Sequence, residues 1–572
     1  MRLLRALVST DHKVIGLLYG VTSLLFLLVG FALVLVIRWQ HAYAGQPLPV
    51  IGALLGDNAP GGILLPEFYN QLGAMHGTIM VFLGVVPLAV GAFGNYVLPL
   101  QIGAPDMTFP RLNLLSYWCY AAGGAVMLAS FFTPGGAASS GWTSYAPLAV
   151  IARDGQTWWL AGMLLLVFSS LLGAINFITT VIQLRAPGLT WFRLPFFVWA
   201  QFVTAFLLLL AFPALQAAAV LQGMDRLADT SFFLPSGLVV GGQAVEGAGG
   251  GNALLWQHLF WFLAHPEVYV LVLPAMGIIA EVIANNTRKP LWGYPLMVYS
   301  LFVLGFLSFL VWAHHMFLTG MGTSISAFFQ ATTMIISIPS VVILSALILS
   351  LYGGSIRFTT PMLFALGFLP MFGLGGLTGL PLGLATTDIP LHDTNYVVAH
   401  FHYLVAPGTI FALFAGIYHW YPKITGRLLN ETLGRIHFVG SLVCMNVIFL
   451  PMFVQGLAGV NRRLWDGGAL YTHAQETLSL NVPMAYAALA LAAFQLPFIV
   501  NLLVTPRLGA VADANPWQAT TLEWATPTPP RPHGNFAVPP RAWRGPYEYS
   551  VPGAAADFTP QGADEPAPSG LG

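Results

Sequence analysis

Histidine is the residue type that gives this sequence most of its potential chemistry: 14 His stand against three Lys among 572 residues. His314 and His315 are adjacent in the segment WAHHMF, and His265 lies in the segment AHPEVY. Adjacent residues of a helix diverge by about 100°, so His314 and His315 converge on one metal only beside a helix end. With His265 as a third nitrogen from another helix, three imidazoles and an open position favour copper over magnesium or calcium.

A second histidine pattern, in the segment VVAHFHYL, predicts haem. His400 and His402 lie at positions i and i+2, which places them about 200° apart on one helix. One metal cannot bind both side chains, but two flat cofactors on either side of the helix can each bind one. His76, in the segment AMHGTIM, is then the second axial ligand of one haem, since haem iron accepts such ligation. The pattern predicts two haems and one copper ion.

Two other reactive side chains belong to the segment HPEVY. Tyr269 lies four residues after His265 and therefore shares its helix face, close to the predicted copper. Glu267 faces elsewhere and is the only carboxylate in the middle of an apolar stretch. A neutral, hydrogen-bonded acid is one interpretation of Glu267. A proton relay is favoured, because acids at membrane depth mark such paths.

The elements that position these residues are transmembrane helices. Charged residues make up 7% of the chain and hydrophobic residues 57%, whereas a soluble domain carries about 25% charged residues. Such a composition predicts an integral membrane protein and argues against nucleic-acid binding by a basic surface. Cys119 and Cys444 both lie in apolar runs, which argues against a disulfide framework or a cysteine-rich metal site.

The hydropathy predicts an all-α fold of twelve transmembrane helices, each of about 20 residues or more. The predicted spans are 14–37, 72–99, 113–133, 158–183, 194–221, 254–285, 294–317, 327–351, 361–385, 399–421, 436–456 and 482–504. Around this catalytic region of 14–504, we expect a short N-terminus at 1–13 and a Pro/Ala/Gly-rich tail at 505–572, extended and partly disordered.

The distribution of basic residues predicts the orientation of the chain. With both termini in the cytoplasm, five of the 21 Lys and Arg residues lie in outer segments and the others on the inner side. That bias agrees with the positive-inside rule. The five outer residues are Arg38, Arg153, Arg226, Arg462 and Arg463.

The chain resembles subunit I of the haem-copper oxygen reductases, of the aa3-type cytochrome c oxidase class in bacteria, over nearly its whole length. The motifs that carry the resemblance are MHGTIM, GNYVLPLQIGAPDMTFPRLN, GWTSYAPLA, HPEVY, WAHHMF, LHDTNYVVAHFHY and NRR. The family's fold is the twelve-helix fold predicted above. Its activity is the reduction of O₂ to water coupled to proton translocation across the bacterial cytoplasmic membrane.

The resemblance implies a role for each matching residue. His76 and His402 would bind the low-spin haem and His400 the high-spin haem, both of haem A type, while His265, His314 and His315 would bind copper. Tyr269 would be cross-linked to His265 and supply an electron and a proton. The remaining implied contacts are Arg38 with a haem formyl group, Arg462 and Arg463 with haem propionates, Trp142 and Asp388 in the propionate region, and His392 and Asp393 with magnesium at a subunit interface.

The family's main proton path is matched in full, but its second path is not. The matching residues of the main path are Asp106, Asn95, Asn113, Asn176, Ser169, Ser170 and, at its end, Glu267. For each Asn or Ser alone, helix packing is an equal alternative. The second path usually has a lysine where this chain has Ile343, and a serine where it has Ala280, followed here by Glu281. Asn395 is a smaller departure, since LHDTYY is usual.

Three functions remain after this comparison. A terminal oxidase is favoured because Tyr269 is retained. A nitric-oxide reductase of the same superfamily is the alternative, since two-electron chemistry needs the tyrosine and a second proton path less, which fits Ile343. A twelve-span proton-coupled transporter explains the span count but neither the spacing of His400 and His402 nor the NRR motif.

The sequence also predicts partners. It contains neither a CxxxC copper pattern nor a CxxCH haem-attachment pattern. Electrons are therefore expected from cytochrome c or a similar donor through a subunit II with a dinuclear copper site. Subunit III, further small subunits and membrane lipids complete the expected assembly.

Overall fold

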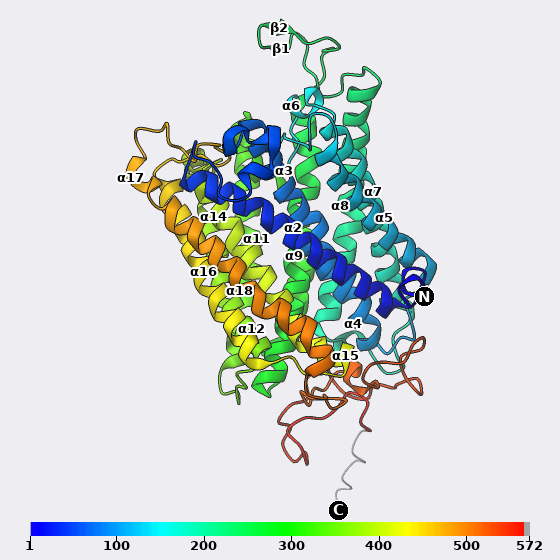
Figure 1. Ribbon diagram of the computed structural model, residues 1–572. Coiled ribbons are helices and arrows are strands. Elements are labelled where there is room, and N and C mark those ends of the chain that lie inside the picture. The colour runs from blue at the N-terminus through cyan, green and yellow to red at the C-terminus, as the bar shows by residue number, and fades with distance from the viewer. Residues whose placement is uncertain (1, 565–572) are drawn as a thin grey trace, which may run out of the picture.

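The computed structural model describes residues 2–564, which form an almost entirely helical protein (Figure 1). Met1 and residues 565–572 of the predicted termini lie outside the described residues. Twelve helices are long and apolar enough to cross a membrane, as the hydropathy predicted. They are α2 (His12–Ala42), α3 to α4 (Pro66–Gln101), α5 with η6 (Pro110–Phe132), α7 (Gly155–Gln183), α8 (Phe196–Leu227), α9 (Ala253–Thr287), α10 with η8 (Tyr294–Thr319), α11 (Thr323–Leu351), α12 (Thr360–Leu382), α14 to α15 (Asn395–Thr425), α16 (Glu431–Leu457) and α17 with α18 (Gln475–Leu508).

Helix α9 lies at the centre of the bundle and is buried over most of its length (Figure 1). It packs against α8, α15, α12, α11 and the short helix η8 (Trp312–Thr319). A helix that is apolar on all sides is stable in such a position, because each face meets another apolar helix. The segment HPEVY is thereby held in the interior of the protein.

Two spans contain π-helical turns near the predicted metal ligands. Helix α3 (Pro66–Thr78) continues into the π-helical turns Ile79–Val85 and Pro87–Ala92, directly after His76. Helix α14 (Asn395–Leu404) continues into the π-helical turn Val405–Ile410, directly after His402. Wide turns of this kind are frequent at functional sites, because they redirect side chains within a helix.

The C-terminal tail packs against one end of the bundle (Figure 1). Helix α18 (Asn481–Leu508) extends four residues beyond the predicted span, and the chain then runs beneath the other helices. Trp524, Tyr547 and Tyr549 of the tail are buried. The tail is largely without helices over residues 509–564, and these aromatic side chains anchor it to the bundle.

The N-terminus and the tail meet at the same end of the bundle. The His12 ring lies 2.8 Å from the Asn535 amide nitrogen. At the opposite end, the strands β1 (Val239–Val240) and β2 (Gln243–Ala244) form a small protruding hairpin (Figure 1).

Candidate metal and haem site

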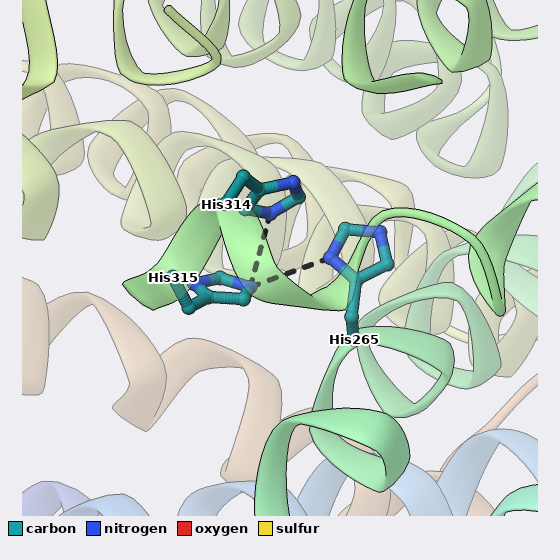
Figure 2. A group of neighbouring side chains, drawn as sticks. All are labelled: His265, His314 and His315. Atoms are coloured by element: carbon teal, nitrogen blue, oxygen red, sulfur yellow. Dashed lines mark hydrogen bonds between the residues drawn. The ribbon is translucent and has the colours of Figure 1, made fainter. Parts of the chain in front are cut away.

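The three histidines predicted to bind copper converge inside the bundle (Figure 2). Their ligand atoms all lie within 4.8 Å of one another, the only such group of three among the described residues. His315 Nε2 lies 3.3 Å from His265 Nδ1 and 3.1 Å from His314 Nε2. Three imidazole nitrogens that face one common point suit a transition-metal ion such as copper.

The local backbone explains how two adjacent histidines reach one point. Helix α10 (Tyr294–Ser308) ends before the pair, and both histidines lie in the 3-10 helix η8, whose residue Met316 has non-helical dihedral angles. The spacing required the pair to lie beside a helix end, and both histidines lie just after the end of α10. The short helix frees the two rings from the divergence of a regular α-helix.

Two neighbours fix the imidazole rings. The ring of Trp261 stacks on that of His315, with centroids 3.7 Å apart and an interplanar angle of 14°. The Thr333 hydroxyl donates to Phe329 O, so at 3.0 Å it accepts from His314 Nδ1. This bond leaves Nε2 of His314 as the nitrogen with the lone pair. Sequence analysis missed the role of Trp261, although it lies four residues before His265.

Tyr269 and Glu267 occupy the positions on α9 that the spacing predicted. The rings of His265 and Tyr269 are 4.8 Å apart, whereas His265 Nε2 is buried with no hydrogen-bond partner among the described residues. Glu267 is 1% exposed, and neither carboxylate oxygen has a described hydrogen-bond partner. A buried acid without a partner is costly, so a functional reason for its presence is expected.

The three predicted haem ligands share one hydrogen-bond pattern. Nδ1 of His76 lies 2.8 Å from Gly30 O, Nδ1 of His400 lies 2.9 Å from Gly375 O, and Nδ1 of His402 lies 2.8 Å from Val398 O. A carbonyl oxygen only accepts, so Nδ1 of each ring carries the proton. Each Nε2 is therefore the atom available to a metal, as in protein sites where a carbonyl orients a ligating histidine.

His400 and His402 point to different neighbours, as their spacing requires. His400 meets α12, where a Cβ atom added at Gly379 would lie 2.6 Å from the His400 ring. His402 stacks on Phe449 of α16, with centroids 4.6 Å apart. The helix α14 therefore presents one histidine on each side.

These donor sets fit the cofactors that the sequence predicted. A copper ion would be held by His265, His314 and His315, and haem iron by His76, His400 and His402 through Nε2. The convergence of His265 Nδ1, His314 Nε2 and His315 Nε2 and the three rings oriented by carbonyl oxygens are the observations that support the fit.

Charged side chains gather in the loops outside the predicted haem ligands. Arg462 donates to Asp393 through Nε at 2.7 Å, and His392 lies 3.3 Å from Asp388 and 3.7 Å from Asp393. Burial acts to raise the pKa of Asp393, but the charge of Arg462 holds it below the usual value. Burial, together with the charge of Arg462, lowers the pKa of Arg463 to about 10.

Trp142 and Arg38 complete the predicted haem surroundings. Trp142 packs against Gly77, the residue after His76, and makes an edge contact with Trp261 at 6.1 Å. It thereby links the two histidine groups. Arg38 is half-buried and lies within electrostatic range of His76 and His402.

Some residues of the predicted proton path form one polar chain. Asn113 Nδ2 donates to Asn95 Oδ1 at 2.6 Å. A cavity of about 40 Å³ lies beside Asn95, Ser169 and Ser170. This volume is large enough for a water molecule. The sequence missed two of its lining residues, Tyr19 and Ser116, although Tyr19 belongs to the conspicuous N-terminal segment STDHKVIGLLY; the Tyr19 hydroxyl lies 3.0 Å from Ser116 Oγ and 3.2 Å from Ser169 Oγ.

Other residues of the predicted path lie apart from this cavity. Asp106 is a half-buried residue of the loop before α5, and burial raises the pKa of its carboxyl. Asn176 holds the same loop by accepting from Phe109 N at 3.0 Å. Glu267 does not line the cavity.

The positions that depart from the family pattern have apolar or structural surroundings. Ile343 is fully buried on α11. Glu281 accepts from the Tyr547 hydroxyl at 2.6 Å and from Phe197 N at 3.2 Å. It therefore caps the start of α8 from a neighbouring helix, because the first N–H groups of a helix need such acceptors.

The fold and this site define a multi-pass membrane protein whose buried histidines are grouped in a way that fits metal cofactors. The sequence profile of the family "Cytochrome C and Quinol oxidase polypeptide I" matches residues 14–494. The chain belongs to this family. Its membership confirms the resemblance to haem-copper oxidases and the expectation of haem and copper as cofactors.

Similar proteins agree over nearly the whole chain. Cytochrome c oxidase subunit 1 of Synechocystis sp. is 43% identical over 542 residues, which cover 95% of this chain and 92% of the relative. Alternative cytochrome c oxidase subunit 1 of Bradyrhizobium diazoefficiens is also 43% identical, with 99% and 94% covered. A cryo-EM structure of a heme-copper terminal oxidase dimer shares the fold, with a TM-score of 0.70, 20% identity, and 88% and 85% of the two chains covered.

Proposed function

We propose that this chain is the catalytic subunit of a respiratory terminal oxidase that reduces O₂ to water and couples the reaction to proton translocation. The observation that carries the proposal is the convergence of His265, His314 and His315 with Tyr269 one helical turn away. Complete O₂ cleavage needs a reductant close to the metals, and Tyr269 is placed to be that reductant.

The protein supplies ligands, dryness and proton delivery for this chemistry. When bound, two haems of A type and one copper ion supply the electrons and the O₂-binding centre. Tyr269 gives an electron and a proton, and His265 Nε2 is free for the covalent link to Tyr269 that the family resemblance implies. Trp261 and Thr333 hold the copper-binding rings still.

Protons for the reaction enter at Asp106 and pass Asn95, Asn113 and the cavity beside Tyr19, Ser169 and Ser170. The polar contacts around the cavity support this path. Asn176 holds the loop that carries Asp106. Glu267 receives the protons in the interior, where its unpartnered carboxylate is available to carry them.

The outer charged cluster binds the haem propionates and a magnesium ion. Arg462 and Arg463 hold propionates, Trp142 and Asp388 complete that region, and Arg38 contacts the haem formyl group. His392 and Asp393 supply two magnesium ligands. Asp388 lies 3.3 Å from His392 in the same cluster, and further ligands come from a partner subunit, as the family resemblance implies.

The source of electrons in another subunit follows from the absence of copper-binding and haem-attachment cysteine motifs in the sequence. A subunit II with a dinuclear copper site passes electrons from cytochrome c, and subunit III and small subunits join the complex in the lipid bilayer. The location is the bacterial cytoplasmic membrane, with both termini in the cytoplasm, as the inner excess of basic residues favours.

Nitric-oxide reduction is the second candidate, and the apolar surroundings of Ile343 favour it. One experiment separates the candidates: O₂ and NO turnover are measured on one purified preparation, with haem extraction and an optical spectrum. We expect haem bands and O₂ consumption. NO turnover without O₂ consumption would reverse the order, and a spectrum without haem would refute both.

A further inference from the structure

Asn535 of the C-terminal tail lies at the mouth of the proposed proton path. It is fully buried although its backbone is left-handed, with φ of 55°. Asparagine tolerates this conformation better than most residues. Its neighbours in space are His12 and Lys13 at the start of α2 and Ala104 in the loop that leads to Asp106.

Every hydrogen-bonding group of the Asn535 amide is used. Nδ2 lies 2.8 Å from Ala104 O and 2.8 Å from His12 Nε2, whereas Oδ1 accepts from Lys13 Nζ at 2.6 Å and lies farther from His12 Nε2, at 3.1 Å. Both N–H groups of the amide thus have an acceptor, and the amide oxygen accepts from the Lys13 ammonium group. The reverse amide orientation would place two oxygens together and a donor against an ammonium, so these contacts fix one orientation.

His12 transmits this arrangement to the path itself. Its Nδ1 lies 2.6 Å from Asn95 O and must carry the proton, because a carbonyl oxygen only accepts. Nε2 is then the acceptor for Asn535 in the neutral ring. One continuous chain therefore joins Ala104 O, Asn535, His12 and Asn95 O.

We propose that Asn535 is a positioning residue for proton uptake, which holds the Asp106 loop in register with Asn95 through His12. This inference rests on the proposed function of the path from Asp106. The link spans the fold, since His12 and Asn535 are 523 residues apart in sequence. The tail is accordingly a structural part of the proton mouth.

Two neighbouring charges, Asp11 and Lys13, belong to the same mouth. Asp11 pairs with Lys13 at 3.0 Å and accepts from His533 N at 2.9 Å. Burial acts to raise the pKa of Asp11, but its hydrogen bonds from His533 and Lys13 lower it. A replacement at Asn535 must therefore be chosen to separate the link to Ala104 from the link to Lys13.

The variant Asn535→Asp makes that separation. It keeps an oxygen for Lys13 but places a second oxygen against Ala104 O and His12 Nε2. Asn535→Ala removes both links. Asn515→Ala is the matched control, because this tail asparagine bonds only locally, with Ala519 N at 2.9 Å and Ala519 O at 2.8 Å.

The experiment uses the purified, complete oxidase with intact tail. Proton uptake in a single turnover is followed with a pH-sensitive dye, and electron transfer is followed by the haem absorbance of the same sample. We expect Asn535→Ala and Asn535→Asp each to slow proton uptake by about tenfold, as the loss of a fixing hydrogen bond implies. Haem spectra should match the parent, and Asn515→Ala should be normal in both measurements.

Other outcomes overturn the inference in distinguishable ways. Normal uptake in Asn535→Asp with slow uptake in Asn535→Ala would assign the effect to Lys13 alone. Normal uptake in both variants, with slow uptake in Asp106→Asn, would refute the role of Asn535 and leave the path. Normal uptake in Asp106→Asn would refute the proposed path and this inference together.

Discussion

Replacement of Thr333 by valine tests whether the trihistidine group binds copper. The Thr333 hydroxyl is the acceptor 3.0 Å from His314 Nδ1, and valine has nearly the same shape without the hydroxyl. The variant therefore leaves a half-buried imidazole N–H without its partner. That N–H bond orients His314 and directs the lone pair of Nε2 toward the other two rings.

Two independent arguments give the size of the effect. Loss of a hydrogen bond to a metal-ligating histidine lowers metal affinity by about 10- to 100-fold. An unpaired buried donor costs about 1–3 kcal/mol, which corresponds to a similar range at 1.4 kcal/mol for each tenfold change. We expect copper affinity in Thr333→Val to fall by about 10- to 100-fold, and Thr333→Ser to retain most of it.

Copper retention is measured by elemental analysis during titration with a chelator of known affinity. The matched control is Thr332→Val, because the neighbouring Thr332 hydroxyl bonds carbonyl oxygens, Leu310 O at 2.9 Å among them, and no imidazole. Copper affinity in Thr333→Val equal to that in Thr332→Val and the parent would refute the assignment of His314 as an oriented ligand.

Three further predictions concern protons. Glu267→Gln should lower turnover by about 100-fold or more with unchanged haem spectra, since a proton carrier contributes that much; full coupled activity would exclude the relay. Asp106→Asn should slow all proton uptake, including uptake during reduction of the metals, because the buried, apolar Ile343 replaces the lysine of the second path. Rapid reduction kinetics would show a second path. The hydrogen bond from Arg288 lowers the pKa of Asp557 below its usual 3.8, so this contact anchors the tail fully above that pH and is lost as the pH falls through the lowered pKa. Limited proteolysis of the tail should therefore accelerate only in acid, and Asp557→Asn should abolish that pH dependence.

The predicted ligands could be placed from the sequence because their arrangement depends on the directions of neighbouring side chains within one helix or at its end. The spacing of His400 and His402 alone placed them on two sides of one helix, and α14 presents them so. The pair His314 and His315 required a helix end, and η8 provides one. Twelve hydropathic stretches gave twelve helices, with ends that differ by a few residues.

Contacts between segments that are distant in the chain could not be predicted from the sequence. Tyr19 meets Ser116 and Ser169 only because α2, α5 and α7 pack with particular rotations. Glu281, which follows one of the departures from the family pattern, caps α8 and also accepts from Tyr547 of the tail. The composition predicted an extended, partly disordered tail, yet its few aromatic residues anchor it to the helix bundle.

The sequence by itself determined the membrane character, the number of helices, the metal-binding residue types and the family. Each of these properties is set within one helix, by about 20 residues of hydropathy or by the angle between neighbouring side chains. Only the tertiary structure decided which nitrogen of each imidazole is free, where the polar cavity lies, and how Asn535 reaches His12. In a bilayer, helices are not driven together by hydrophobicity, so their rotations follow from many small packing contacts and interhelical hydrogen bonds that no single segment specifies.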